Sequence, residues 1–279
     1  MARRSYPTDL SDAEYACIEP HLPRPCARGR PRQHALRAIL DGIFYVARSG
    51  GAWRLLPHEF PPWQTVYHYF RQWRLDGTWE RLHSALRTAV RLRAGREPQP
   101  SAGIVDSQSV KTTGVGGVRG YDGGQKISGR KRHLLVETQG LVLRARVHSA
   151  ALQDRAAVPL LLDGAAEQFP RLTHLWADQG YTGTGKAWIE EQLGWSVDIV
   201  QHPPKPRAVW APIGAVIDWD RLRPKGFRGV LPRRWVVERT IGWLGQSRRL
   251  SKDYERLCAT SESLIYIVMS RIMARRLAR

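Results

Sequence analysis

The chain has 279 residues, and its Lys and Arg outnumber its Asp and Glu by 44 to 25, which gives a formal net charge of +19 and favours polyanionic partners such as nucleic acid. No stretch approaches the roughly 18 consecutive apolar residues of a membrane-spanning helix, and no apolar signal core follows the N-terminus, so we expect a cytoplasmic protein. Its three cysteines form no Cys-x-x-Cys pair, which argues against a disulfide framework or a cysteine zinc site.

Helical periodicity dominates the first third of the sequence. The apolar spacing predicts helices over residues 10–22, 35–48, 63–75 and 78–93. Ser11 and Asp12 are suitable N-caps for the first of these helices. Residues 93–101 combine Pro, Gly and charge without apolar periodicity, which is typical of a linker. We therefore predict two domains, a helical one over residues 1–95 and a second one over residues 96–279.

After the linker the pattern changes to short apolar segments that are typical of strands alternating with helices. A first strand is predicted to end at Asp106, and a hairpin turns at Thr138-Gln139-Gly140. The remaining predicted elements are the hairpin strands 133–137 and 141–148, helix 153–169, strand 172–177, helix 184–193, strand 196–200, a Pro-rich irregular stretch over 201–232, and helices 234–249 and 260–277. This alternation predicts an α/β domain.

Two of the predicted strands lead directly into a carboxylate, at Asp106 and at Asp178. An acid at the end of a buried strand costs desolvation energy, and a bound cation is the usual compensation. A single strand that ends in a solvated Asp is common, so each acid alone is weak evidence. Two such acids together favour a site.

Glu238 is the third candidate, on a predicted helix with an apolar stripe. Arg234 precedes it by one turn, so an exposed ion pair, worth about 0 to 1 kcal/mol, is the simple alternative. Three carboxylates would suit Mg²⁺, which prefers oxygen ligands, and a two-metal site can promote in-line displacement at phosphorus. The sequence contains no motif for a covalent Ser or Cys nucleophile or for a zinc protease, which agrees with such chemistry.

A glycine-rich stretch over residues 114–129 precedes a basic run. Its Gly-x-x-x-x-Gly spacing resembles a phosphate-binding loop, but Arg130-Lys131 stands where that loop needs Lys followed by Ser or Thr. We therefore reject ATP binding there. The basic run comprises Lys126, Arg130, Lys131 and Arg132. It could form a solvated face or contact phosphates beside the first acid, and the sequence leaves both open.

The predicted helix over residues 63–75 is a candidate DNA-recognition helix. Its polar surface would carry Tyr67, His68 and Arg71. The same helix also contains Phe70 and Trp73, so it could equally belong to the core. The eleven tryptophans of the chain fit core packing better than base stacking.

Several long segments resemble one family. They are VDSQSVKTT around Asp106, GYDGGQKISGRKRHLLVETQGLVL after it, WADQGYTG around Asp178, RRWVVERTIGWL and RRLSKDYE around and after Glu238, and WRLLPHEFPPWQTVYHYFRQWRLDGTW in the N-terminal part. Together they resemble the insertion-sequence-five family of DDE transposases over nearly the whole chain.

This resemblance implies a ribonuclease H-like catalytic domain, a mixed sheet flanked by helices, joined to an N-terminal helical DNA-binding domain. Asp106 would lie on the first strand, Asp178 after the fourth and Glu238 on a late helix, and the three would hold two Mg²⁺ ions, for which Mn²⁺ could substitute. The implied partners are double-stranded DNA, as transposon ends and target, and further copies of the chain. Membranes are not among them.

The sequence departs from the family's third-acid signature of Tyr, Arg, Glu and Lys at fixed spacing. Arg234 and Glu238 match, but Leu231 stands at the Tyr position and Gly245 at the Lys position. Arg249 follows Glu238 by eleven residues, about three helical turns, and so would return to the same helix face. We predict that Arg249, with Arg248 and Lys252 nearby, supplies the missing cation to DNA phosphates.

The leading hypothesis is a transposase that binds terminal inverted repeats, cleaves DNA and transfers strands. One alternative is a non-catalytic DNA-binding protein, either a regulator or an inactive transposon copy. Another is a plain metal-dependent nuclease, since hydrolysis and strand transfer differ only in which hydroxyl attacks. The end sequence, target site, oligomeric state and activity of this copy do not follow from the sequence.

Overall fold

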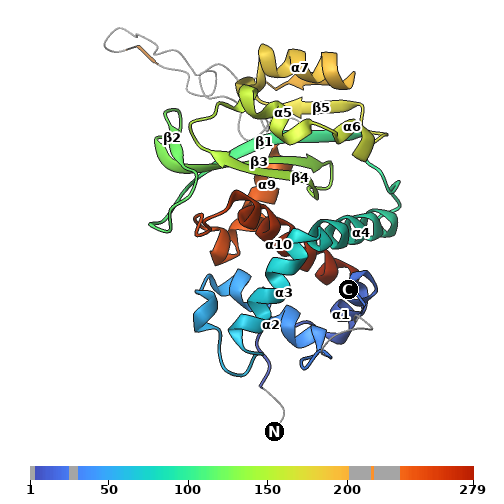
Figure 1. Ribbon diagram of the computed structural model, residues 1–279. Helices are drawn as coiled ribbons and strands as arrows, with labels where there is room; N and C mark the ends of the chain where they lie inside the picture. The colour runs from blue at the N-terminus through green and yellow to red at the C-terminus, as the bar shows by residue number, and fades with distance from the viewer. Residues whose placement is uncertain (1–3, 25–30, 201–214, 217–232) are drawn as a thin grey trace.

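The computed structural model describes residues 4–24, 31–200, 215–216 and 233–279 (Figure 1). Its α-helices are α1 (Asp12–Ile18), α2 (Leu36–Ser49), α3 (Trp63–Leu75), α4 (Thr78–Arg93), α5 (Val158–Leu162), α6 (Ala165–Gln168), α7 (Thr184–Leu193), α9 (Arg234–Gly245) and α10 (Cys258–Leu277). Short 3₁₀ helices are η1 (Glu19–His21), η2 (Trp53–Leu55), η3 (Asp154–Ala157), η4 (Gln179–Tyr181) and η6 (Arg248–Leu250). Within these residues no helix is long and apolar enough to cross a membrane.

One mixed sheet forms the centre of the C-terminal part. Its strands are β1 (Ala102–Lys111), β2 (Gly120–Asp122), β3 (Ile127–Glu137), β4 (Val142–Ser149), β5 (His174–Ala177) and β6 (Ser196–Ile199). Strand β3 lies antiparallel between β1 and β4, whereas β5 and then β6 continue parallel to β1 on its other side. Three antiparallel strands followed by two parallel ones give the ribonuclease H-like fold, and helices flank the sheet (Figure 1).

Strand β1 does not end at Asp106, as the apolar pattern predicted, but continues to Lys111. Its second half pairs with the start of β3, as far as Lys111 opposite Gly129. A Cβ atom at Gly129 would lie 1.9 Å from the carbonyl oxygen of Val110, so only glycine fits there. The glycine-rich stretch over residues 114–129 contributes β2 and the beginning of β3.

Some of the predicted helix bounds agree with the structure and others do not. The three helices α3, α4 and α7 have the predicted bounds. The helix predicted over 153–169 is broken into η3, α5 and α6, because Pro159 opens α5 and Gly164 adopts a left-handed backbone with φ 66° before α6. The helix predicted to reach Arg249 ends at Gly245.

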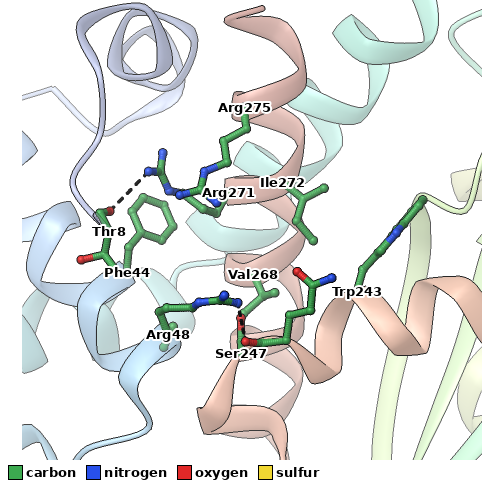
Figure 2. A pocket seen from close by; sticks show the side chains of 11 residues that line it. Thr8, Phe44, Arg48, Trp243, Ser247, Val268, Arg271, Ile272 and Arg275 are labelled. Carbon is green, nitrogen blue, oxygen red and sulfur yellow. Dashed lines mark hydrogen bonds between the residues drawn. The ribbon is translucent and has the colours of Figure 1, made fainter. Parts of the chain in front are cut away.

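The N-terminal helices share one hydrophobic core with the end of the chain. Helix α10 packs against α4, α2 and α1 on one side and against β4 on the other (Figure 1). Hydrogen bonds cross the same junction, from Arg48 to the carbonyl of Gln246 and from Arg271 to the carbonyl of Thr8 at 3.4 Å (Figure 2). The division at residue 95 stays a prediction: the N-terminal helices share their core with the later part of the chain, whereas a second hydrophobic cluster consists only of residues between 105 and 197.

Buried ion pairs connect segments that are far apart in the sequence. Arg130 on β3 lies 3.1 Å from Asp253, and both side chains are fully buried. Arg91 at the end of α4 pairs with Glu137 at the end of β3. Such pairs contribute little net stability, but removal of one partner leaves an uncompensated charge in the interior.

Replacement of Asp253 by Ala should therefore lower the free energy of unfolding by about 3–5 kcal/mol, because Arg130 stays buried without its carboxylate. Urea unfolding followed by circular dichroism measures this change. The matched control is Glu190→Ala, which breaks the exposed pair with Lys186 and should cost about 1 kcal/mol at most. Equal losses in the two variants would contradict the structural role of the buried pair.

Candidate active site

The three predicted acids converge on one guanidinium nitrogen. Nη2 of Arg234 lies 3.5 Å from Oδ2 of Asp106, 3.9 Å from Oδ2 of Asp178 and 3.7 Å from Oε1 of Glu238. The topology explains the meeting of the first two acids, because β1 and β5 are parallel neighbours with Ile104 opposite Trp176. Arg234 and Glu238 are one turn apart on α9, which packs against β1. Acids distant in sequence thus share one site.

A cavity of about 470 Å³ is lined by two of these acids, Asp106 and Asp178, whereas Glu238 is not part of its lining. Four carboxylates and two cations line it, namely Asp106, Asp122, Asp154, Asp178, Lys131 and Arg234. The cavity lining is therefore net negative, although the whole chain carries a charge of +19. The side chain of Glu238 is more exposed than the other two predicted acids, with 60% of its surface accessible.

Asp154 and Asp122 are site residues that the sequence reasoning missed. Oγ of Ser107 donates to Oδ1 of Asp154 at 2.7 Å, and Nζ of Lys131 lies 3.0 Å from the same oxygen. Asp122 accepts from Ser109 and lies 3.4 Å from Lys131. Neither acid follows an apolar strand, which was the signal that identified Asp106. The alternating serines after Asp106 would have revealed the longer strand and its polar lining.

Burial dominates the electrostatics of Asp106. Its pKa is raised to about 6 by desolvation, and the nearby charges of Asp178 and Asp154 raise it further. The charge of Arg234 and the hydrogen bond from the backbone N–H of Ser107 lower this pKa but do not offset the burial. The charge of Arg234 therefore compensates only part of the cost of burying the Asp106 carboxylate.

The donor set has the chemistry of a divalent-cation site. Its groups are carboxylate oxygens, which Mg²⁺ and Mn²⁺ prefer, and they carry more negative charge than the two cations balance. In the arrangement described, no three His, Cys, Asp or Glu side chains of the described residues are already placed as metal ligands. The guanidinium of Arg234 takes the central position between the acids instead.

A chain of buried hydrogen bonds supports the turn that carries Asp178. Nδ1 of His148 donates to the carbonyl of Ser149 at 2.9 Å, so its Nε2 accepts from Nδ1 of His133 at 3.0 Å. Nε2 of His133 must then accept from the hydroxyl of Tyr181. Burial lowers the pKa of His133 to about 3, which agrees with a neutral ring. The chain ties η4, just after Asp178, to strands β3 and β4.

The basic run on β3 divides into two groups. Lys126 is exposed in the turn before β3, and Lys131 faces the acidic cavity. Arg130 and Arg132 are instead buried, and their guanidinium groups donate to backbone carbonyls of the segment between η6 and α10. This placement speaks against the predicted phosphate contacts of Arg130 and Arg132, because both bind the protein itself. The sequence shows that basic residues follow one another here, but it does not show which of these side chains are buried by the sheet.

The predicted role of Arg249 also meets a structural obstacle. Helix α9 ends at Gly245, so Arg249 lies on η6 and does not extend the face of Glu238. Its side chain is buried, lies 2.6 Å from Glu255 and donates to the carbonyl of Gly51 at 2.8 Å. The helical spacing argument was therefore wrong. Arg248 and Lys252 are exposed, so their contact with DNA stays a prediction.

One face of helix α3 belongs to the core and the other is exposed. Phe70 and Trp73 are buried in the core, whereas Tyr67, His68 and Arg71 are exposed. Contact between DNA and these three residues stays a prediction. Leu231, at the family's Tyr position, lies outside the described residues.

The ribonuclease H-like sheet, with an acidic cavity beside β1 and β5, defines a class of nucleic-acid-processing domains. Residues 97–273 match the family model described as "Transposase DDE domain", and residues 10–83 match "Putative transposase of IS4/5 family". The chain belongs to the DDE transposase family. It is also 35% identical over 113 residues to the insertion element IS402 uncharacterized 16.2 kDa protein of Burkholderia cepacia. This match covers 38% of this chain and 76% of that protein. No solved structure matches the chain.

Replacement of Asp106 by Asn should stabilise the metal-free protein above pH 6, because it removes a buried charge. The pKa of Asp106 is raised to about 6, so the folded protein loses stability as pH rises from the unfolded pKa near 4 through 6. The variant's gain should reach about 3 kcal/mol at most at pH 8 and vanish below pH 4. Thermal unfolding in chelator across pH measures it, and the exposed Asp198→Asn is the control. A gain that does not change with pH would contradict this origin.

Replacement of Tyr181 by Phe should destabilise the fold by about 1–3 kcal/mol, because Nε2 of His133 loses its buried donor. Denaturant unfolding at pH 7 is the measurement. Tyr121→Phe, at an exposed tyrosine, should change stability by less than about 0.5 kcal/mol. Similar values for the two variants would show that the hydrogen-bonded chain does not hold the turn.

Proposed function

We propose that this transposase-family member binds transposon terminal inverted repeats and cleaves and rejoins DNA with Asp106, Asp178 and Glu238 as its catalytic acids. The observation that supports the proposal is the convergence of these three carboxylates, from β1, the end of β5 and α9, on Nη2 of Arg234. An exposed ion pair does not require three separate elements to place their carboxylates together. A metal-dependent phosphoryl-transfer site does require it, because the acids share the bound ions.

The same three acids would hold Mg²⁺, with Mn²⁺ as a substitute, and two ions are expected. When bound, such ions activate the attacking oxygen and stabilise the leaving oxygen during displacement at phosphorus. The net negative lining of the cavity and the raised pKa of Asp106 both favour a cation there. Asp154, beside Asp178 across Gly180, adds a fourth carboxylate to this environment.

The chain's own cations would have separate tasks. Arg234 reduces repulsion among the acids and keeps them together before DNA arrives. Lys131 is held in the cavity by Asp122 and Asp154, where its ammonium group can contact a DNA phosphate. Exposed Lys126, Arg248 and Lys252 would contact the DNA backbone outside the cavity.

The helical part, residues 1–95, would recognise the transposon ends. Helix α3 presents Tyr67, His68 and Arg71 to solvent while its opposite face anchors it in the core. A helix held in this way can enter the major groove as a rigid element. Two ends must be brought together for transposition, so the active form is expected to be a homo-oligomer on DNA.

The test is cleavage and strand transfer of labelled transposon-end DNA with and without Mg²⁺. Asp106→Asn, Asp178→Asn and Glu238→Gln should each lower the cleavage rate by roughly 100-fold or more, since each removes a carboxylate that would hold the metal ions and so weakens their stabilisation of the transition state. Binding of the same DNA should persist in gel-shift assays. Asp198→Asn, at an exposed carboxylate on β6, should cleave like the parent.

The products decide between the related functions. Joined products in the presence of target DNA support a transposase, whereas cleavage without joining would indicate a plain nuclease. DNA binding without Mg²⁺-dependent cleavage by the parent chain would indicate a non-catalytic DNA-binding protein. Normal cleavage by all three acid variants would overturn the assignment of these residues.

A further inference from the structure

A second cavity, of about 150 Å³, lies at the sheet edge formed by β4, between α4 and α10. It shares no lining residue with the acidic cavity. Three guanidinium groups line it, those of Arg87, Arg144 and Arg146, against one carboxylate, that of Glu80. The two cavities therefore have opposite charge.

Arg87 is the unusual member of this cavity. Only 2% of its surface is exposed, and among the described residues no carboxylate lies within salt-bridge distance. Nη2 donates to Ser84 at 3.1 Å and the group lies over the ring of Phe169, but Nε has no hydrogen-bond partner in the described part of the chain. Glu137, a nearby carboxylate, is already paired with Arg91. A buried charge of this kind is costly unless an anion compensates it.

His83 lies one turn before Arg87 on α4 and faces the same cavity. It is fully buried beside Tyr266, with ring centroids 5.0 Å apart, and its Nε2 has no hydrogen-bond partner among the described residues. Two adjacent buried side chains thus have polar atoms without a protein partner at one cavity. Buried polar groups nearly always have partners, so a ligand or ordered water is needed here.

The other two arginines complete a basic wall on β4. Arg144 donates through Nη1 to the carbonyls of Leu161 and Asp163. The carboxylates of Asp163 and Glu167 act on its charge, but among the described residues neither forms a salt bridge with it. Arg146 lies 3.8 Å from Glu262, at the outer limit of an ion pair. Both side chains are only half-buried, so they form the accessible side of the cavity while Arg87 forms its floor.

We propose that this cavity binds a small phosphate-type oxyanion. The oxyanion would balance the charge of Arg87, accept hydrogen bonds from Arg87 and His83 at the floor, and accept further bonds from Arg144 and Arg146 at the wall. Such an ion would join α4 of the N-terminal part to the edge of the catalytic sheet. The burial of Arg87 and His83 favours a free ion over a DNA phosphate, which would reach only the wall.

Thermal unfolding of the full chain in sodium phosphate, compared with sodium chloride at equal ionic strength, tests this site. Phosphate should raise Tm in proportion to the logarithm of its concentration once that concentration exceeds Kd, by about 5 °C at a hundredfold excess over Kd. The double variant Arg144→Gln with Arg146→Gln should lose this logarithmic part of the rise. Arg87→Met, at the floor of the cavity, should lose it as well. If Arg87→Met does not fold, the double variant, called the wall variant below, still decides the test.

The matched control is Arg155→Gln, which removes an exposed arginine whose Nε donates to Gln153. Phosphate also stabilises proteins by exclusion from their surface; that part grows roughly in proportion to concentration and should be the same in all variants. An equal logarithmic rise in the parent and the wall variant would overturn the proposal. So would a parent whose Tm responds to phosphate no more than to chloride.

A short duplex without transposon ends distinguishes the source of the phosphate group. If a free ion occupies the cavity, the wall variant should bind this duplex with the same salt dependence as the parent. If DNA supplies the phosphate, the wall variant should bind it more weakly and its salt slope should fall by about one to two. Either result supports the oxyanion site once the thermal shift is lost in the wall variant, and neither depends on DNA cleavage.

Discussion

Repulsion among clustered carboxylates, of which Asp106 is buried, is the constraint on which the catalytic part of this protein depends. Asp106 and Asp178 are brought together by the parallel pairing of β1 and β5, and α9 adds Glu238. Such a cluster needs positive charge, and Arg234 provides it from the same helix that carries the third acid. Burial still raises the pKa of Asp106 to about 6 despite this guanidinium. A divalent cation would bring further positive charge to the carboxylates, which agrees with the metal dependence that is general among DDE transposases.

Local patterns in the sequence predicted the elements well where the chain itself determines them. The bounds of α3, α4 and α7 follow from apolar spacing and from adjoining Pro or Gly residues, so they were predicted correctly. The second half of β1 was missed because its stability comes from pairing with β3, which has no local signature. Likewise, Asp106 and Asp178 could be found from the strands that precede them. Asp154 could not, since only the tertiary fold places it beside Ser107 and Lys131.

The basic character of the chain has two physical origins that composition does not separate. Part of it is exposed and free to meet a polyanion, as at Lys126 and Lys252. Another part is interior, where Arg130, Arg132 and Arg249 donate to backbone carbonyls and so join the segment between α9 and α10 to the rest of the fold. Arginine suits this second task because one planar group can satisfy several carbonyls at once. A charge run on a strand therefore predicts a DNA-facing surface only after the strand's two faces are known.

The packing of α10 against the N-terminal helices has a consequence for the order of events during synthesis. Helices α1, α2 and α4 leave the ribosome first, yet part of their apolar surface is covered by a helix formed from residues 258–277. They stay incompletely buried until residues 258–277 have also been translated. A premature stop codon before residue 258 would therefore leave apolar surface of α1, α2 and α4 uncovered in addition to removing α10, so the translated fragment would lack the packing that these helices need.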